Sequence, residues 1–316
     1  MDKNLKIAVV CGGFSTEREV SLRSGKAVYD SLCHKGYKNV NLFDLTKENV
    51  VELLKLEIDI VYLALHGKGG EDGSIQGLLD LAGIPYTGSN VATSAICMNK
   101  ILTKRFLCSA NFPTAQFVTI CKEDIKNKKQ LEETLIAKFG FPMVIKAPSQ
   151  GSSIGVTIVK ERDNLFNSIV QTFQYEDEVL VERFIEGVEV TLPILGNNEL
   201  LILPEVEIET TNDFYDYEAK YVKGESQHII PARISEGIRD NLRDLGQSIY
   251  KSIGCRGLSR IDFIIDKSGQ PWAIEINTLP GMTETSLFPD AANKIGVSFG
   301  DLVEKILSLA WDLYST

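Results

Sequence analysis

The sequence lacks the features that define several large classes of proteins. No apolar run approaches the roughly 18 residues of a membrane-spanning helix, and the first residues, MDKNLK, lack the apolar stretch of a signal peptide. Positive charge is also scarce: 33 Lys and Arg stand against 43 Asp and Glu, a net charge of −10. A nucleic-acid-binding surface would need a basic patch. These absences argue against membrane and nucleic-acid partners and lead us to expect a cytoplasmic protein.

Cysteine and histidine are too scattered to indicate a disulfide framework or a zinc site. The 6 cysteines form no C-x-x-C pair, so we expect buried free thiols in a reducing compartment. The 3 histidines, His34, His66 and His228, lie far apart and lack zinc-ligand spacing. The glycine signatures G-x-G-x-x-G and G-x-x-x-x-G-K-[ST] are missing too. In a chain of negative net charge, local cations and amide groups must hold any phosphate ligand.

What is present is an ordinary globular composition arranged in three regions. With 316 residues, 44% hydrophobic and 24% charged, the chain should form two or three domains. Strands alternate with helices over residues 1–98, which predicts a parallel sheet that binds ligands beyond the carboxyl ends of its strands. Residues 99–187 predict a small α+β unit, and residues 188–316 are mostly strand. The helical spacing of apolar residues and the helix stop signals predict helices over 17–32, 90–110, 236–253 and 299–313.

Residues 259–277 predict a β-hairpin with four polar side chains on one face. If residues 267–270 form the turn, Asp262 lies opposite Glu275 and Arg260 lies opposite Asn277. Side chains alternate between the faces of a strand, so these four project to the same side. The other face, which should pack on the core, then carries Ile261, Phe263, Ile274 and Ile276.

The two opposed carboxylates should repel each other unless a cation lies between them. At a separation of about 5 Å and an effective dielectric constant near 20, the repulsion is roughly 3 kcal/mol. Two carboxylates and an amide oxygen suit Mg²⁺, with water and phosphate oxygens completing its shell. The alternative interpretation is a hairpin whose polar face is merely solvated.

Two further segments predict contacts with a nucleotide. Lys146 ends an apolar strand and precedes the glycine-bounded loop 151–155 (GSSIG), and loop amides beside a lysine can cradle a phosphate. The strand end 182–185 (ERFI) can pair its backbone with a flat base and cover it with apolar side chains. Glu189 could then accept hydrogen bonds from ribose hydroxyls. A plain hairpin turn and a plain strand end remain the alternatives.

Three other positions allow two interpretations each. Glu17, in the first turn of a helix, either complements the helix dipole or holds an ammonium group of a ligand. His66, in a glycine-rich loop after a strand, is either structural or catalytic. Residues 214–221 (FYDYEAKY) belong to an irregular stretch of roughly 20 residues, which is either a lid or an amphipathic strand.

Taken in order, six motifs make the sequence resemble the D-alanine–D-alanine ligase family, a branch of the ATP-grasp enzymes. They are GGFSTEREVSLRSG at 12–25, HGKGGEDG at 66–73, GSSIGV at 151–156, FYDYEAKY at 214–221, RID at 260–262 and EINTLPGMTETSL at 275–287. The resemblance covers nearly the whole chain. It implies the ATP-grasp fold, with an N-terminal parallel-sheet α/β domain (1–98), a central α+β subdomain (99–187) and a C-terminal β-rich subdomain (188–316) with a lid at about 208–231.

By this resemblance, Asp262, Glu275 and Asn277 hold two Mg²⁺ or Mn²⁺ ions, and Glu275 bridges both. ATP is expected between the central and C-terminal subdomains. The positions that match nucleotide-binding residues of the family are Lys100, Lys146, Glu182, Arg183, Phe184, Ile185, Glu189 and Lys220. The family usually has lysine or a similar residue at the Arg183 position and often tryptophan at the Phe184 position. Both departures should be tolerated, because backbone contacts and an apolar cover remain available here.

The implied reaction makes D-alanyl-D-alanine for cell-wall peptidoglycan in two steps. The carboxylate of the first D-alanine attacks the γ-phosphate of ATP, giving an acyl phosphate and ADP, and the amine of the second then attacks the carbonyl. Arg260 and the amide of Gly281 are expected to stabilise the oxyanion, and Glu17 to hold the first ammonium group. The other expected site residues are His66 beside the first alanine, Ser286 and Leu287 beside the second, and Ser152 and Tyr221, which with Glu17 tie down the lid.

The second substrate and the partners follow from the same resemblance. Relatives that use D-lactate tend to depart from the region of Tyr221, so its retention favours an amine. The nearest alternative is another ATP-grasp carboxylate–amine ligase with different substrates, for example of the D-Ala-D-Ser or D-Ala-D-Lac type. A nicotinamide dehydrogenase is disfavoured by the missing fingerprint, and a non-catalytic ATP-binding regulator by the presence of Arg260 and both carboxylates. The expected partners are D-alanine, ATP and a second copy of the chain, since homodimers are common in the family.

Overall fold

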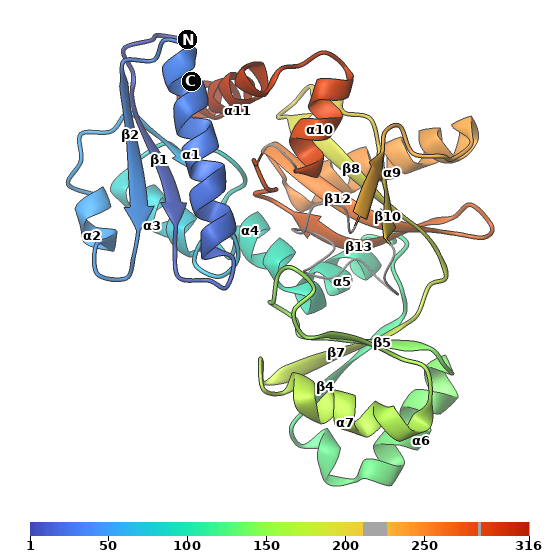
Figure 1. Cartoon of the computed structure of the whole chain (residues 1–316). Coiled ribbons are helices and arrows are strands. Elements are labelled where there is room, and N and C mark those ends of the chain that lie inside the picture. Colours follow the sequence, from blue (N-terminus) through green and yellow to red (C-terminus); the bar gives the residue numbers. More distant parts are fainter. Residues whose placement is uncertain (211–225, 284–285, 316) are drawn as a thin grey trace.

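A computed structural model describes residues 1–210, 226–283 and 286–315, and these residues form three sheets (Figure 1). The expected fold class is confirmed: a parallel-sheet α/β unit precedes a small α+β unit and a strand-rich unit. Residues 211–225, which contain most of the predicted lid, lie outside the described residues. Within the described ranges, no helix is long and apolar enough to span a membrane.

The first sheet is parallel, in the order β2-β1-β3, and its central strand is buried on both faces. Ile7 and Val9 of β1 pack in one core with helices α1 and α11, whereas Ala8 and Val10 pack in another with α3. This double burial explains the continuous apolar run in the sequence. The elements are β1 (Lys6–Gly12), α1 (Arg18–His34), β2 (Asn39–Leu45), α2 (Val50–Leu53), β3 (Ile60–Leu63) and α3 (Ser74–Ala82).

The second sheet is antiparallel, in the order β4-β7-β5-β6, with two helices on one face (Figure 1). Met143 and Ile145 point into the core beneath the helices. The alternate residues of the strands point to the opposite face of the sheet, because successive side chains alternate between the two faces. The elements are β4 (Phe117–Cys121), a 3₁₀ turn η1 (Asp124–Lys126), α6 (Lys128–Phe139), β5 (Met143–Lys146), β6 (Val156–Val159), α7 (Arg162–Thr172) and β7 (Glu178–Arg183).

The third sheet has the order β11-β10-β8-β12-β13, with β9 also paired to β8. Helix α9 packs its apolar stripe on this sheet, where Leu242 and Ile249 are fully buried. The elements are β8 (Gly187–Gly196), β9 (Leu200–Ile202), β10 (Val206–Thr210), β11 (Ser226–Ile229), α9 (Glu236–Ile253), β12 (Gly257–Asp266), β13 (Pro271–Asn277), α10 (Leu287–Lys294) and α11 (Phe299–Tyr314).

The single helix expected over 90–110 is wrong, because the chain forms two helices, α4 (Val91–Met98) and α5 (Lys100–Ser109). Asn99 between them has an extended backbone, and its side chain accepts hydrogen bonds from the amides of Ile101 and Leu102. Asparagine is a strong N-cap, so it starts a new helix at Lys100. The break places Lys100 at a helix N-terminus, where its own amide donates to the carbonyl of Pro148.

The expected register of the hairpin is confirmed at its functional end: Asp262 pairs with Glu275 and Arg260 with Asn277. Nearer the turn the pairing shifts by one residue, because a β-bulge leaves Ile274 without a partner on β12. Placing Ile274 on the core face was therefore wrong. It is only partly buried and lines a cavity, while Ala273 takes the core position opposite Phe263.

We predict that Asn99→Ala lowers the free energy of unfolding by about 1 kcal/mol, the usual cost of losing an asparagine cap. Asn90→Ala is the matched control, because Asn90 caps α4 through the amide of Thr93 and should cost a similar amount. Denaturant titrations of the two variants would check both values. An Asn99→Ala protein as stable as the unmutated chain would contradict the assigned cap.

Candidate active site

Two adjoining cavities contain the sequence-predicted site residues that the structure describes. The larger cavity, about 380 Å³, lies between the second and third sheets. The smaller, about 120 Å³, lies between the first sheet and the loop after β13. Lys100 and Glu275 line both cavities. Lys220 and Tyr221 lie outside the described residues, so the structure does not place them.

The predicted residues divide between the cavities by the role expected of them. The predicted residues in the larger cavity are Lys100, Lys146, Glu182, Arg183, Phe184, Ile185, Glu189, Asp262 and Glu275. Those in the smaller cavity are Glu17, His66, Lys100, Ser152, Arg260, Glu275, Asn277, Gly281, Ser286 and Leu287. Residues expected to contact a nucleotide are therefore separated from those expected to contact amino acids, and the shared pair forms the boundary.

Asp262 is a buried carboxylate of the hairpin with several hydrogen-bond donors around it. It is 5% exposed, and Arg260 donates to both of its oxygens, at 2.9 Å from Nε and 2.8 Å from Nη2. The Asn277 amide donates to the same carboxylate at 3.1 Å, and the Thr191 hydroxyl also donates to it. Because Asn277 uses its NH₂ group here, its amide oxygen is left for other partners.

Glu275 is more open than Asp262 and has a cation beside it. Its side chain is 24% exposed, and the Lys100 ammonium lies 3.4 Å from Oε2. Lys100 also donates to the carbonyl of Gln150 at 2.8 Å. This ammonium therefore relieves part of the repulsion between the opposed carboxylates.

The hairpin residues fit a Mg²⁺ ion that is shared with a phosphate ligand. Among the described residues there is no cluster of three or more His, Cys, Asp and Glu that could enclose a metal. Asp262 and Glu275 nevertheless face each other, and an amide oxygen belongs to the neighbouring pair. Mg²⁺ in phosphoryl-transfer sites commonly takes one or two carboxylates and obtains its other ligands from water and phosphate. The donor set is suited to that mode and not to a closed protein cage.

One end of the larger cavity is built around a buried carboxylate and two lysines. The Glu182 carboxylate lies 3.2 Å from the Lys146 ammonium and 3.4 Å from that of Lys104. Burial alone would raise the pKa of Glu182, but the two ammonium groups outweigh it and lower the pKa below its ordinary value. Glu182 is therefore an anion at neutral pH.

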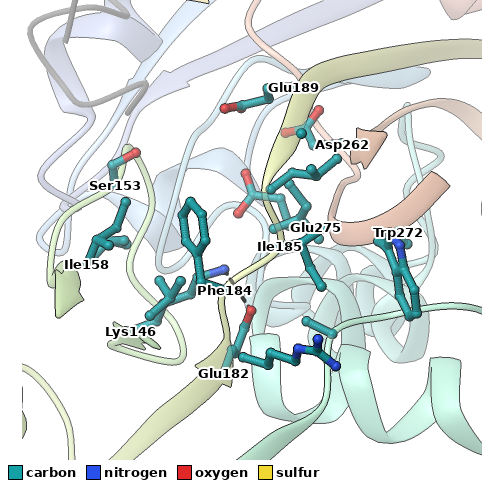
Figure 2. Close-up of a pocket in the computed structure, with 18 of the residues that line it drawn as sticks. Lys146, Ser153, Ile158, Glu182, Phe184, Ile185, Glu189, Asp262, Trp272 and Glu275 are labelled. Atoms are coloured by element: carbon teal, nitrogen blue, oxygen red, sulfur yellow. Dashed lines mark hydrogen bonds and ion pairs between the residues drawn. The ribbon is translucent and has the colours of Figure 1, made fainter. Parts of the chain in front are cut away.

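The middle of the larger cavity is lined by apolar side chains. Figure 2 shows Phe184 and Ile185 between Lys146 and Glu182 at one end and Glu189 and Asp262 at the other. Such apolar walls with polar groups at the ends are typical of ligand pockets. Further apolar side chains that sequence reasoning did not assign to the cavity are Val144, Ile158, Ile264, Trp272 and Ile274.

The loop after β5 lies at the entrance to the smaller cavity in an unusual backbone conformation. Ser152 and Ser153 have φ of 50° and 61°, values that L-residues rarely adopt and that cluster at functional sites. The Ser152 hydroxyl donates to Glu17 across the cavity. A Cβ on Gly151 would lie 2.3 Å from Glu17 Oε2, so a larger residue at this position would displace the Glu17 carboxylate.

His66 holds the loop after β13 in place. Burial lowers the pKa of His66 below its ordinary value despite the nearby charge of Glu17, so the ring is neutral at neutral pH. Its Nδ1 lies 3.2 Å from the carbonyl of Leu279, and Nε2 lies 3.2 Å from the Ser24 hydroxyl. These partners fit a ring that donates through Nδ1 and accepts at Nε2. Ser24 in turn accepts from the amide of Met282.

Two chemically important residues were missed by sequence reasoning. Glu71 lines the smaller cavity and accepts a hydrogen bond from the amide of Gly67 at 2.7 Å. Burial and the charge of Glu17 raise the pKa of Glu71 to about 8. Lys104 lines the larger cavity. It follows Lys100 by four positions, which places both on one face of α5, and that spacing was the available signal.

We predict that Glu71→Gln flattens the pH dependence of stability between about pH 5 and pH 8. The folded pKa of about 8 lies above the ordinary value of 4.5, so in this interval the folded protein binds a proton that the unfolded chain has released. Stability therefore falls as pH rises toward 8, and glutamine removes this contribution. Thermal unfolding of the ligand-free protein at several pH values would test it. The exposed Glu199→Gln serves as a control and should keep the slope of the unmutated chain; parallel profiles for all three proteins would contradict the prediction.

Comparison with protein families gives matches over most of the chain. Residues 45–89 match the family described as D-ala D-ala ligase N-terminus, and residues 106–308 match the D-ala D-ala ligase C-terminus. The chain is 48% identical over 308 residues to a D-alanine–D-alanine ligase of Desulforamulus reducens, covering 97% of this chain and 98% of the relative. It is 47% identical to the ligase of Carboxydothermus hydrogenoformans, covering 96% and 98%.

Solved structures agree with these matches. The D-alanine–D-alanine ligase of Bacillus anthracis complexed with ATP is similar with a TM-score of 0.84 and 32% identity, over 99% of this chain and 98% of that one. The VanG D-Ala:D-Ser ligase of Enterococcus faecalis is similar with a TM-score of 0.82 and 32% identity, over 97% and 99%. The likeness extends over all three sheets.

Proposed function

Because the chain belongs to the D-alanine–D-alanine ligase family, we propose that it joins two D-alanine molecules into D-alanyl-D-alanine at the expense of ATP. The fold is that of the ATP-grasp enzymes. ATP occupies the larger cavity, and the two amino acids occupy the smaller one. The observation that carries the proposal is that the two cavities share Lys100 and Glu275. A phosphoryl group at this boundary would be within reach of a carboxylate on the other side.

In the first step, a carboxylate oxygen of the first D-alanine attacks the γ-phosphorus of ATP. The bond between that phosphorus and the bridging oxygen breaks, ADP leaves, and an acyl phosphate forms. Lys100 and Lys146 supply positive charge against the phosphates, and pre-placed charges of this kind lower the barrier without reorganisation. Glu17, which already accepts from Ser152, holds the ammonium group of the first D-alanine.

Asp262, Glu275 and Asn277 would hold two Mg²⁺ or Mn²⁺ ions, which when bound neutralise charge on the transferred phosphoryl group. Arg260 contributes to the site in two ways. It donates to both oxygens of Asp262 and so fixes the orientation of that carboxylate, and it lines the smaller cavity itself. Arg260 therefore lies between the expected metal ligands and the amino-acid site.

In the second step, the amine of the second D-alanine, once deprotonated, attacks the acyl carbonyl. A tetrahedral intermediate forms, its oxygen carries negative charge, and inorganic phosphate then leaves with the C–O bond pair. Arg260 and the amide of Gly281 stabilise that oxygen. The His66 contacts fix the loop that contains Gly281, so His66 acts by positioning. Ser286 and Leu287 line the part of the cavity assigned to the second D-alanine.

The identity of the second substrate separates this function from its nearest alternative. One similar structure is a D-Ala:D-Ser ligase, so a D-Ala-D-Ser or D-Ala-D-Lac product is the second candidate. Tyr221 and Lys220, assigned by resemblance to the lid and the nucleotide, keep those roles as proposals. So do the homodimer, the cytoplasmic location and the role in peptidoglycan synthesis.

We predict that D-alanine alone supports ADP release at neutral pH, and that D-serine or D-lactate added as second substrate gives slower turnover. A coupled ADP-release assay with product identification would measure this. The physical reason is that the Glu17 carboxylate lines the smaller cavity and favours substrates with an ammonium group. Faster formation of the depsipeptide with D-lactate would reject the D-alanine assignment.

We predict that Glu275→Gln lowers kcat by at least about 100-fold with the fold intact, because it removes an anionic ligand from the phosphoryl-transfer centre. The control is Glu199→Gln, an exposed position that lines neither cavity, which should retain full activity. Circular dichroism would verify the fold of both variants, and the magnesium dependence of kcat would be measured in parallel. Normal activity with normal magnesium dependence in Glu275→Gln would remove Glu275 from the metal site.

A further inference from the structure

Lys104 is a cation that the molecule has removed entirely from solvent. Its side chain is 0% exposed, and its ammonium donates to the Thr114 hydroxyl at 2.8 Å and to the carbonyl of Ala115 at 3.3 Å. The third neighbour is Glu182 Oε2 at 3.4 Å. Burying a charge is costly unless partners compensate it. The position of Lys104 is therefore fixed by protein groups on several sides, and it has no freedom to follow a ligand.

Glu182 is held asymmetrically by its two lysines. Both Lys104 and Lys146 approach the same oxygen, Oε2. The other oxygen, Oε1, is buried and has no hydrogen-bond partner among the described residues. A buried acceptor without a donor is destabilising, because it has lost its hydrogen bonds to water without gaining others. Since Glu182 lines the larger cavity, a donor on the occupant of that cavity would remove this cost.

The two lysines differ in what they can do once a nucleotide is bound. Lys146 ends β5 beside the loop 151–155 and retains 9% exposure of its side chain, so it can contact phosphate oxygens. Lys104 also lines the cavity, but its side chain is 0% exposed and its ammonium is held by Thr114, Ala115 and Glu182, so it acts on the ligand through Glu182. When Lys146 is engaged by phosphate, Lys104 remains as the constant cationic partner of Glu182.

We propose that Lys104 is a positioning residue for base recognition: it fixes Glu182 so that Oε1 accepts a hydrogen bond from the exocyclic amine of adenine. Lys104 thereby sets the preference of the site for a 6-amino purine without touching the nucleotide. This inference rests on the proposed function, because it assumes that the larger cavity binds ATP. The lowered pKa of Glu182 supports it, since the acceptor is then a carboxylate, and hydrogen bonds to charged groups are the stronger ones.

The test compares ATP with purine riboside triphosphate, which lacks only the 6-amino group. Calorimetric binding of each nucleotide, measured without D-alanine, gives a ratio of Kd values. We expect the unmutated protein to favour ATP by about tenfold or more, the usual effect of a charged hydrogen bond. In Lys104→Met the ratio should fall toward one, with the loss mostly in ATP affinity. The KM for D-alanine should not change.

Leu107→Ala is the matched control for general disturbance of α5. Leu107 is on the same helix and 0% exposed, and it packs in a hydrophobic core without being among the residues that line the larger cavity. This variant should lose stability and keep the ATP preference. If Lys104→Met also keeps the preference, or weakens both nucleotides equally, Lys104 has no role in base recognition and the proposal is overturned.

A double-variant cycle tests whether Lys104 acts through Glu182 and also covers the case in which Lys104→Met fails to fold. Glu182→Gln should itself reduce the ATP preference, and adding Lys104→Met to it should cause no further change. The double variant removes both members of the Lys104–Glu182 pair together, and the remaining ammonium, that of Lys146, lines the cavity, so this variant should fold. A further fall of the ratio in the double variant would overturn the proposal.

If the unmutated protein binds ATP with this preference but ligates no D-alanine, only the proposed function fails; if it binds neither nucleotide, both fail.

Discussion

The site depends on one pairing, that of Asp262 with Glu275 across the hairpin of β12 and β13. Two carboxylates at this spacing repel, and the surrounding structure compensates them separately. Asp262 receives both nitrogens of the Arg260 fork and the Asn277 amide, whereas Glu275 has the Lys100 ammonium at 3.4 Å. The protein's own donors thus hold the two carboxylates in place before a cation arrives. A bound metal ion would add its positive charge to the Arg260 and Lys100 charges that already offset their repulsion.

The same pairing joins the two halves of the proposed reaction. Glu275 lines both cavities, and its partner Lys100 does so as well. Lys100 reaches this position because Asn99 ends one helix and caps the next, and its ammonium also binds the carbonyl of Gln150. The break between the two helices, the hairpin register and the contact with the loop all place groups at the boundary between the two cavities. The acyl phosphate formed there would meet the amine of the second substrate without crossing solvent, and this protects it from hydrolysis.

Alternation along β12 and β13 was sufficient to predict the pairing of Asp262 and Glu275, because the functional end of the hairpin follows the simple period of two. The β-bulge was not predictable in this way, because Ile274 resembles a core residue in the sequence. Only the packing of Ala273 in the core shows that Ile274 is the residue without a partner on β12. Lys104 was missed for a related reason. Its spacing from Lys100 indicated the helix face on which it lies, but a lysine in a helix is ordinarily solvated, and the burial of Lys104 depends on Glu182 and Thr114, which are distant in sequence. Contacts between remote segments decide burial in such cases, and periodicity alone does not reveal those contacts.

A chain with a net charge of −10 is at first sight a poor receptor for a polyanion, and the site shows why the overall charge is a weak guide. Charges beyond the Debye length of about 8–10 Å are largely screened at ordinary ionic strength. Within that distance, a pair at about 4 Å with an effective dielectric constant of 20 interacts by about 4 kcal/mol. Lys100 and Lys146 line the larger cavity and can meet phosphate oxygens directly, whereas Asp262 and Glu275 line it as carboxylates that would face phosphate through a bound metal ion. The position of individual charges therefore decides whether phosphate binds, and acidic residues elsewhere on the surface have little effect on it.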